Sequence, residues 1–395
     1  MSEKDIKTQN ENKEETNHLH ELLSSIKPAL MTEMMFGIFR FREQGKTITT
    51  PDAKLKFIGI LITSAFVALF GVFLRLAGAI TGMIKVMDAI GDLPSVVILI
   101  QYVASAITTA FAFSETNIKI ILAFEELDTA LHLNINRSYY NQARKHTILL
   151  LIILFIIHVL FSAGDLYFST KISPSDVIVL PIYFVQDLGV VFFYKMISMV
   201  KDRLDVVNDY LRTYIKAKDE KDETVFLVNN IPMKIKDLAN TYDVIGETCS
   251  WINEVFNFQI FMTLVSTFTY VVITIWTSLY FFRNQANTNA TAESLVNIGI
   301  WCIRCIFTVA VMCFACERLL LVRNDTKILV NEVIMDYNLP NQTRLQAKAF
   351  MELIEAWPLR IFVYDMFSVD ITLMLKFISV ATTYLIVIIQ ISHFI

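Results

Sequence analysis

The sequence lacks the excess of basic residues that a nucleic-acid-binding surface needs. It carries 34 Lys and Arg against 38 Asp and Glu, for a formal net charge of −4, so no nucleic-acid partner is expected. It also lacks an early apolar run. The first 27 residues are polar and charged, which excludes the apolar core of a cleaved signal peptide and predicts a disordered cytosolic tail.

Enzyme signatures are missing as well. The sequence contains no glycine-rich phosphate loop, no His-Glu-x-x-His, no Gly-x-Ser-x-Gly and no cluster of His and carboxylates at ligand spacing. Two Cys-x-x-Cys pairs begin at Cys302 and Cys313, but both lie in one apolar stretch. We expect them to be small buried residues at helical spacing, because a metal site inside hydrocarbon has no plausible role. No enzymatic activity, cofactor or metal is predicted.

Apolar residues, in contrast, are abundant and come in long runs. Hydrophobic residues make up 55% of the chain and its mean hydropathy is +0.52, which indicates an all-α, polytopic helical membrane protein. Seven stretches are long and apolar enough to span a bilayer. They lie at about residues 57–77, 95–113, 147–163, 177–197, 256–282, 298–314 and 367–394.

The distribution of Lys and Arg between the spans predicts the orientation, because positively charged segments stay in the cytoplasm. The N-terminal segment and the second, fourth and sixth connections together hold 23 Lys and Arg, whereas the other three connections hold 3. We therefore expect a cytoplasmic N-terminus and an extracellular C-terminus. This is opposite to a G-protein-coupled receptor. A glycosylation sequon at Asn289 falls in the predicted outer fifth connection.

The inner connections are long and carry apolar residues at helical spacing. Residues 200–215 continue the fourth span, residues 235–252 lead into the fifth, residues 317–337 extend the sixth, and residues 345–357 precede the last. These helices should pack beneath the membrane, either as a platform within one subunit or as an assembly domain between subunits. The predicted division is 1–56, a cytoplasmic tail with an interfacial helix at 31–41; 57–197, spans one to four; 198–255, a cytoplasmic extension; 256–314, spans five and six; 315–366, cytoplasmic anchor helices; and 367–395, the pore-lining span.

Polar and aromatic side chains inside the spans are the candidates for ligand binding, because polar groups are costly there. Aromatic faces with a few amide or carboxylate groups suit a small polar or amphipathic ligand. Asp187 could instead form a buried ion pair, with Arg304 as a possible partner. The candidate ligand residues are Gln101, His158, Tyr183, Asp187, Trp276, Tyr280 and Trp301.

The last span carries an amide, Gln390, near its outer end. Facing lipid, this amide would be unsatisfied, at a cost of several kcal/mol. Several copies around an axis would instead form a ring of amides flanked by aliphatic rings, which is how a hydrophobic constriction can be built. The same stripe contains Thr383, either Ile386 or Val387, and either His393 or Phe394, at helical spacing. The stripe contains no carboxylate, so strong charge selectivity is not predicted.

Thr383-Tyr384, five aliphatic residues and Gln390 together resemble the C-terminal signature of the insect gustatory receptors, which are related to the insect odorant receptors. The family's motif ends in Gln-Phe, whereas this chain has Ile391 after Gln390. The resemblance implies a ligand-gated, nonselective cation channel of four subunits, with the last span lining the pore and Gln390 and Ile391 forming the gate. It also implies a location in the plasma membrane of sensory neurons.

A small tastant is expected to enter from outside and open the channel to permeating cations, with membrane lipid around it. Either a homotetramer or a hetero-oligomer with related receptors is compatible with the sequence. The residue after Thr383-Tyr384 is Leu385, not the acidic residue associated with the sugar-receptor branch, which favours other tastants. The alternative is a secondary transporter of a small solute. Such proteins favour inverted repeats and broken helices, and Pro181 is the one candidate break in the sequence.

Overall fold

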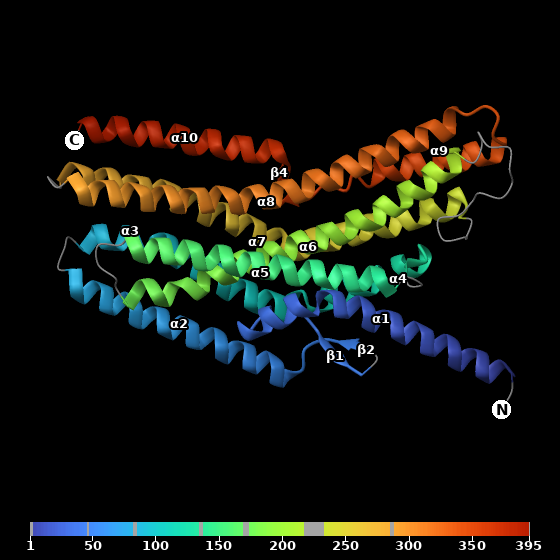
Figure 1. The fold of residues 1–395 in the computed structure, drawn as a ribbon, viewed down its shortest axis with the longest axis horizontal. Coiled ribbons are helices and arrows are strands. Elements are labelled where there is room, and N and C mark those ends of the chain that lie inside the picture. The colour runs from blue at the N-terminus through green and yellow to red at the C-terminus, as the bar shows by residue number, and fades with distance from the viewer. Residues whose placement is uncertain are drawn as a thin grey trace.

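The computed structural model describes residues 3–45, 47–81, 85–133, 137–168, 174–216, 233–284 and 288–394. The elements in chain order are α1 (Glu3–Met35), β1 (Arg42–Gln44), β2 (Thr47–Thr49), α2 (Ala53–Thr81), α3 (Lys85–Ile107), the π-helical turn η1 (Thr108–Ala112), α4 (Ser114–Ala130), α5 (Arg137–Phe168), α6 (Pro174–Lys216), α7 (Ile235–Asn284), α8 (Thr288–Met335), α9 (Asn341–Ala356), β3 (Phe362–Val363), β4 (Phe367–Ser368) and α10 (Ile371–Phe394). Most helices lie along one long axis (Figure 1).

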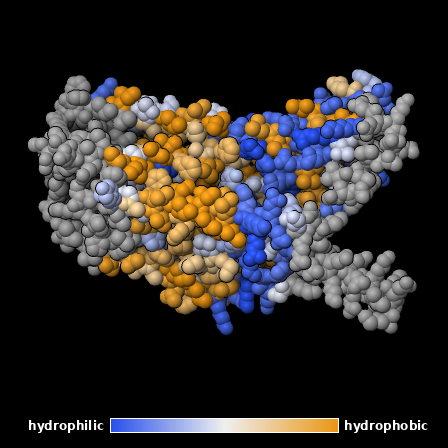
Figure 2. Space-filling model, in the orientation of Figure 1, coloured by the Kyte–Doolittle hydropathy of each residue, from blue (hydrophilic) through white to orange (hydrophobic). Residues whose placement is uncertain are grey.

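The predicted all-α membrane fold is confirmed. Among the described residues, α2, α3, α5, α6, α7 and α8 each contain a segment long and apolar enough to cross a membrane. The seventh predicted span corresponds to α10, in which Ile371–Tyr384 is a shorter apolar segment. Figure 2 shows apolar side chains covering the middle of the molecule, beside a hydrophilic region towards the α9 end.

The three longest helices extend well past their apolar segments. α6 has 43 residues, α7 has 50 and α8 has 48, whereas a membrane span needs about 20. Their polar ends pack with α9 into one core, so the predicted amphipathic stripes are buried. The buried residues on these ends are Leu204, Val207, Leu211, Leu238, Tyr242, Ile245, Ile252, Leu319, Val330, Phe350 and Ile354.

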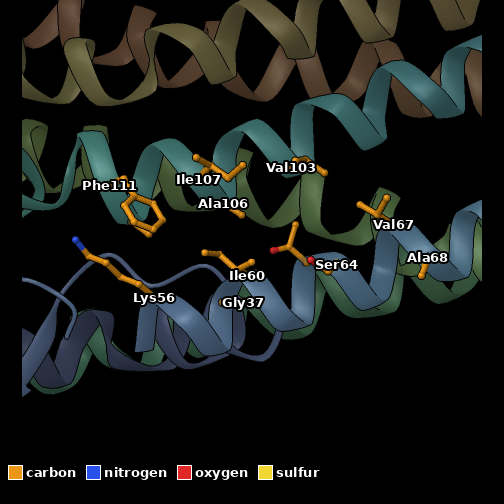
Figure 3. A pocket seen from close by; sticks show the side chains of 13 residues that line it. Gly37, Lys56, Ile60, Ser64, Val67, Ala68, Val103, Ala106, Ile107 and Phe111 are labelled. Atoms are coloured by element: carbon orange, nitrogen blue, oxygen red, sulfur yellow. The ribbon is translucent and has the colours of Figure 1, made fainter. Parts of the chain in front are cut away.

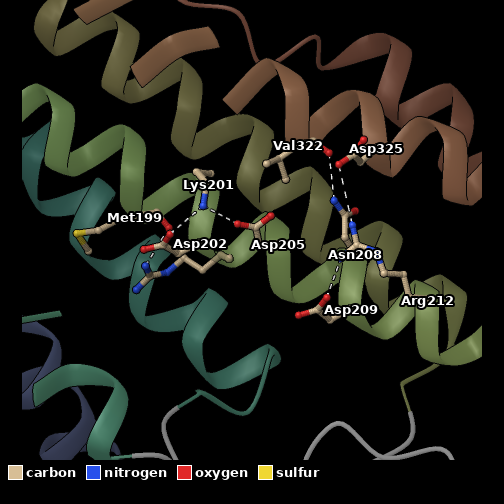
Figure 4. Close-up of polar contacts among 10 residues, drawn as sticks. Met199, Lys201, Asp202, Asp205, Asn208, Asp209, Arg212, Val322 and Asp325 are labelled. Carbon is tan, nitrogen blue, oxygen red and sulfur yellow. Dashed lines mark hydrogen bonds and ion pairs between the residues drawn. The ribbon is translucent and has the colours of Figure 1, made fainter. Parts of the chain in front are cut away.

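Polar contacts at this end tie α6 to α8 and support α6 itself (Figure 4). The Asn208 amide donates to the Val322 carbonyl over 3.1 Å, which links the two helices. On the surface of α6, Lys201 Nζ lies 2.6 Å from Asp205 Oδ2, one turn further along. The buried amide contact fixes how the helices pack, whereas an exposed ion pair contributes at most about 1 kcal/mol.

The predicted disordered tail is wrong for the part of the N-terminal segment whose side chains the structure describes. Residues 19–27 belong to α1, and Leu22 and Ile26 are buried in the main core. The predicted interfacial helix at 31–41 is also wrong in its bounds, because α1 ends at Met35. After the turn, Arg40 forms a buried ion pair with Glu33 at 2.7 Å. The many charged residues of the segment favoured a prediction of disorder, although a narrow stripe of apolar residues lies along one face of the helix.

Two further details differ from the sequence-based expectations. A helix, α4, occupies the first half of the predicted second inner connection, 114–146. Helix α6 runs through Pro181 as one element from Pro174 to Lys216, so the proline does not break the helix. Pro340 lies between α8 and α9, and it directly precedes the first residue of α9.

Helix α10 lies at one side of the molecule, across the bundle from α2 (Figure 1). It contacts α7 and α8, and Asp370 caps its start by accepting a 3.0 Å hydrogen bond from the Leu373 backbone N–H. The short hairpin of β3 and β4 leads into it. This arrangement leaves most of α10 exposed.

Candidate ligand site and pore helix

An ion pair joins α6 and α8 inside the bundle. Arg304 Nη2 lies 2.6 Å from Asp187 Oδ2, and the Arg304 side chain is 7% exposed. The Thr308 hydroxyl, one turn along α8, lies 3.5 Å from the other carboxylate oxygen of Asp187. Asp187 therefore has a protein counter-ion, as the ion-pair alternative expected. In a low-dielectric interior, separating the two side chains would leave two uncompensated charges, which costs several kcal/mol.

Three aromatic rings pack beside this ion pair. The Tyr183 ring centroid lies 5.0 Å from Trp301 and 6.3 Å from Tyr270, and Tyr270 lies 5.4 Å from Trp301. The Arg304 guanidinium sits 4.9 Å from the centroids of both Tyr183 and Trp301. The rings come from α6, α7 and α8. A cation over aromatic faces, paired with a carboxylate, can recognise an amphipathic molecule by stacking and by oriented hydrogen bonds.

A network of amide and hydroxyl side chains lies between α3, α6 and α7. Gln101 Nε2 donates to the Thr263 hydroxyl over 2.8 Å, and Gln186 Nε2 donates to the Ser266 hydroxyl over 2.9 Å. A cavity of about 20 Å³ borders Gln101 and Gln186, which is room for about one water molecule. In this conformation Gln101 therefore satisfies neighbouring hydroxyls and does not line a space for a larger ligand.

His158 packs against a neighbouring ring, and the other two predicted ligand residues lie outside the described side chains. The His158 ring packs edge-on against Phe184 with centroids 5.2 Å apart. The side chains of Trp276 and Tyr280 in α7, and of Asn289 in the first turn of α8, lie outside the part of the structure that is described. The described residues thus bring together Tyr183, Asp187 and Trp301 of the predicted set.

The predicted ligand set does not include Arg304, Tyr270 or Thr308, although Arg304 is a predicted ion-pair partner of Asp187. Thr308 follows Arg304 by four residues, so both lie on one face of α8. This spacing of four residues is the feature of the sequence that could have indicated Thr308. Ser95, whose hydroxyl lies 3.3 Å from the Tyr183 hydroxyl, gave no such signal because α3 and α6 are distant in the chain.

The predicted gate residues lie on α10. Phe268 of α7 packs against one side of this helix, with ring centroids 5.4 Å from Tyr384 and 6.3 Å from Phe377. The opposite side carries exposed residues at intervals of three or four, which places them on one face. These are Thr372, Lys376, Ser379, Thr383, Val387 and Gln390. The side chains of Ile391 and Phe394, further along α10, lie outside the described part.

Comparisons with known proteins agree with this architecture. The model of the 7tm Chemosensory receptor family matches residues 27–393. A solved structure of the insect olfactory receptor OR5 from Machilis hrabei in complex with eugenol aligns with a TM-score of 0.65 at 12% identity, covering 95% of this chain and 100% of that chain. A second OR5 structure gives 0.58 at 14% identity with the same coverage. No curated protein matches the sequence.

At 12% and 14% identity, the structural likeness to OR5 establishes the fold. The sequence family is established separately, because the family model matches nearly the whole chain. The predicted resemblance is therefore confirmed at the level of the family. By this match the chain is a multi-pass membrane protein that belongs to the 7tm chemosensory receptor family.

Proposed function

We propose that this chain is a gustatory receptor that works as a tetrameric, ligand-gated, nonselective cation channel opened by a small extracellular tastant. The C-terminal motif supports the gustatory branch, because Thr383-Tyr384 and Gln390 follow that branch's spacing. The proposed location is the plasma membrane of sensory neurons, with the N-terminus in the cytoplasm. Either four copies of this chain, or copies combined with related receptors, would surround the pore.

The exposed stripe of α10 is the observation that carries the proposal. In a single chain, Thr383 and Gln390 face away from α7 and α8. The Thr383 hydroxyl donates to the Ser379 carbonyl of its own helix, so the Gln390 amide is the group that hydrocarbon would leave unsatisfied, at a cost of several kcal/mol. Around a shared axis the same stripe would face water, with Val387 as an apolar constriction between the polar rings. Assembly thus gives this helix face a favourable environment that one subunit does not supply.

The proposed tastant site is the aromatic cluster with its ion pair. A ligand that stacks on Tyr183 and Trp301 would compete for the Arg304 guanidinium and loosen its contact with Asp187. Because this ion pair joins α6 to α8, loosening it would change how these helices pack. Trp276 and Tyr280 are proposed as further contacts. Coupling of this kind is typically worth about 1–3 kcal/mol.

The buried cytoplasmic ends of α6, α7 and α8, together with α9, are proposed as the assembly domain. Their stripes form one core within the subunit, which gives the pore helix a fixed support. We propose residues 198–255 and 315–366 for this role in assembly. The transporter alternative draws no support from α6, because this helix continues through Pro181.

Whole-cell recording from a host that expresses this chain alone tests the proposal. The panel contains sugars and bitter plant compounds, and single-channel recording follows on any active compound. Ligand-evoked steps carried by both Na⁺ and K⁺ are expected. Solute uptake without single-channel steps would establish the transporter instead. If the chain reaches the cell surface but carries no current, co-expression with related receptors tests whether the channel forms only as a hetero-oligomer.

Replacing Trp301 with Leu tests the tastant site within the same assay. Loss of stacking should raise the half-maximal tastant concentration, by roughly 5-fold to 150-fold if the whole coupling is affected, while the single-channel conductance stays unchanged. The matched control is Trp251→Leu on α7, because Trp251 is partly buried but belongs to the cytoplasmic core. Equal shifts in the two variants would argue against ligand binding at Trp301.

A further inference from the structure

A groove of about 300 Å³ runs along the outside of the bundle between α2 and α3 (Figure 3). Ser64 and Val67 of α2 face Val103 and Ala106 of α3 across it. The large side chains along the same surface are apolar and exposed, with Ile60, Ile107 and Phe111 each about half exposed. In a membrane protein such a surface meets lipid acyl chains.

The turn that follows α1 borders the groove towards its Lys56 end (Figure 3). Gly37 has a φ of +79° and packs against Gly59 of α2. A Cβ on Gly59 would lie 2.8 Å from the Gly37 carbonyl oxygen, closer than side-chain carbons come to backbone. Both glycines line the groove, so its floor is formed by backbone and has a fixed shape.

Lys56 supplies a positive charge at this end. Its Nζ lies 4.9 Å from the centroid of the Phe111 ring across the groove (Figure 3). Of the other cations near the turn after α1, Lys27 pairs with Glu43 and Arg42 pairs with Asp52, whereas Lys54 forms no ion pair with a described residue. Within the described part of the chain, no ion pair is formed by Lys56. Its charge is therefore available to an external anion.

The groove is placed to face lipid in an assembly as well as in the single chain. Helix α2 lies across the bundle from α10 (Figure 1), so subunits that share an axis at α10 would keep α2 at the periphery. On the predicted orientation, Lys56 lies near the cytoplasmic leaflet, where anionic lipids are concentrated. An acyl chain and an anionic headgroup both match this surface.

We propose that this groove binds one glycerophospholipid with an anionic headgroup. Its acyl chain lies between α2 and α3, and its phosphate contacts Lys56 at the end that the turn of Gly37 borders. The site is separate from the tastant cluster on α6, α7 and α8. It holds even if the chain proves not to be a gustatory channel, because it depends on α2, α3 and the turn after α1.

Native mass spectrometry of the full chain, purified and delipidated in detergent, tests the site. The protein is titrated with phosphatidylserine, phosphatidylcholine or soluble phosphoserine. Phosphatidylserine should bind best, and Lys56→Gln should weaken that binding by about fivefold, the effect of one basic residue near an anionic lipid surface. The matched control is Lys54→Gln, because Lys54 is exposed on α2 but does not line the groove. This control should bind like the wild type.

A second pair of variants tests the acyl-chain half of the site. Ser64→Phe places a ring in the groove from an exposed position, whereas Ala65→Phe places the same ring on the neighbouring exposed position outside it. Only Ser64→Phe should abolish the stoichiometric lipid adduct. Equal binding of the two lipids, phosphoserine binding as tight as lipid binding, or equal effects within either pair overturns the proposal. If Ser64→Phe does not fold, the lysine pair decides the outcome.

Discussion

Arg304 Nη2 and Asp187 Oδ2 lie 2.6 Å apart although the two residues are separated by 117 positions in the chain. Their side chains are 7% and 13% exposed. The ion pair therefore fixes α8 against α6 at the point where the aromatic rings of Tyr183 and Trp301 gather. It links the stability of the fold to the proposed tastant site, so the two roles must be separated by experiment.

Replacing Asp187 with Asn should destabilise the protein strongly. Removing one member of a buried ion pair leaves an uncompensated charge and costs about 3–5 kcal/mol. The double variant Asp187→Asn, Arg304→Gln removes both charges and should recover most of that loss. Thermal unfolding of the purified proteins measures both the loss of stability in the single variant and its recovery in the double variant. Arg318→Gln, at an exposed position of α8, should behave like the wild type. A stable Asp187→Asn variant would contradict the structural role of the pair.

Much of the fold was predictable because its signals are local in the sequence. Runs of apolar residues predict the spans, and the spacing of Leu204, Val207 and Leu211 predicts the buried face of α6 outside them. The N-terminal tail shows the limit of composition. Leu19, Leu22, Leu23 and Ile26 follow the spacing of one helix face and are buried, but the charges around them favoured a prediction of disorder.

The candidate site was less predictable, because it is made by helices that are distant in the chain. The sequence indicates only that Tyr183 and Trp301 both lie inside membrane spans. That their rings meet at 5.0 Å depends on the packing of α6 on α8, which no spacing rule gives. Similarly, the hydrogen bond from Gln101 to Thr263 depends on the contact between α3 and α7. The sequence alone therefore could not show whether this intramembrane amide binds a ligand or packs inside the bundle.

Gly246→Ala should loosen the contact between α7 and the segment after α9. A Cβ at this position would overlap the Trp357 ring. The ring is held in place because Trp357 Nε1 donates to Asp243 Oδ1 over 2.7 Å, and its carbonyl accepts from the Tyr242 hydroxyl over 2.9 Å. Overpacking of this kind typically costs about 1–3 kcal/mol, which should lower the unfolding temperature of the purified protein.

The control for this substitution is Gly71→Ala in α2. A Cβ on Gly71 would meet no atom within 4 Å, so the change there is neutral or stabilising, because Ala favours helix by about 1 kcal/mol over Gly. A Gly246→Ala protein as stable as the Gly71→Ala protein would show that Trp357 moves aside without cost.

Asp370→Ala should destabilise the start of α10 at neutral pH by about 1 kcal/mol, the typical cost of losing an N-cap. Burial raises the pKa of the Asp370 carboxyl, but hydrogen bonds from the Ser368 hydroxyl and the Leu373 backbone N–H outweigh it and hold the pKa below its usual value. The charged form therefore stabilises the fold above the unfolded pKa of about 4.

This contribution is lost as the pH falls through the lowered pKa of the folded state, because protonation removes the negative charge that strengthens the hydrogen bonds of the cap. Thermal unfolding of the wild type and of Asp370→Ala, measured from pH 7 down to about pH 3, should show a difference that shrinks at the acid end. Asp370→Asn is the control, since asparagine also caps helices. A difference that does not depend on pH would rule out the charged cap.

Gln390→Ala should change single-channel conductance or basal leak while the protein still reaches the cell surface. Gln390 is exposed on the face of α10 that points away from α7 and α8, so the substitution creates no cavity within the subunit. In the proposed tetramer it replaces a ring of amides by methyl groups, which makes the pore mouth wider and less polar. Thr382→Ala is the control: Thr382 is also exposed but does not belong to the stripe that contains Thr383 and Gln390, and its hydroxyl, like that of Thr383, donates to a carbonyl of its own helix. Wild-type currents from Gln390→Ala would remove Gln390 from the gate, and altered currents from both variants would indicate a general effect on α10.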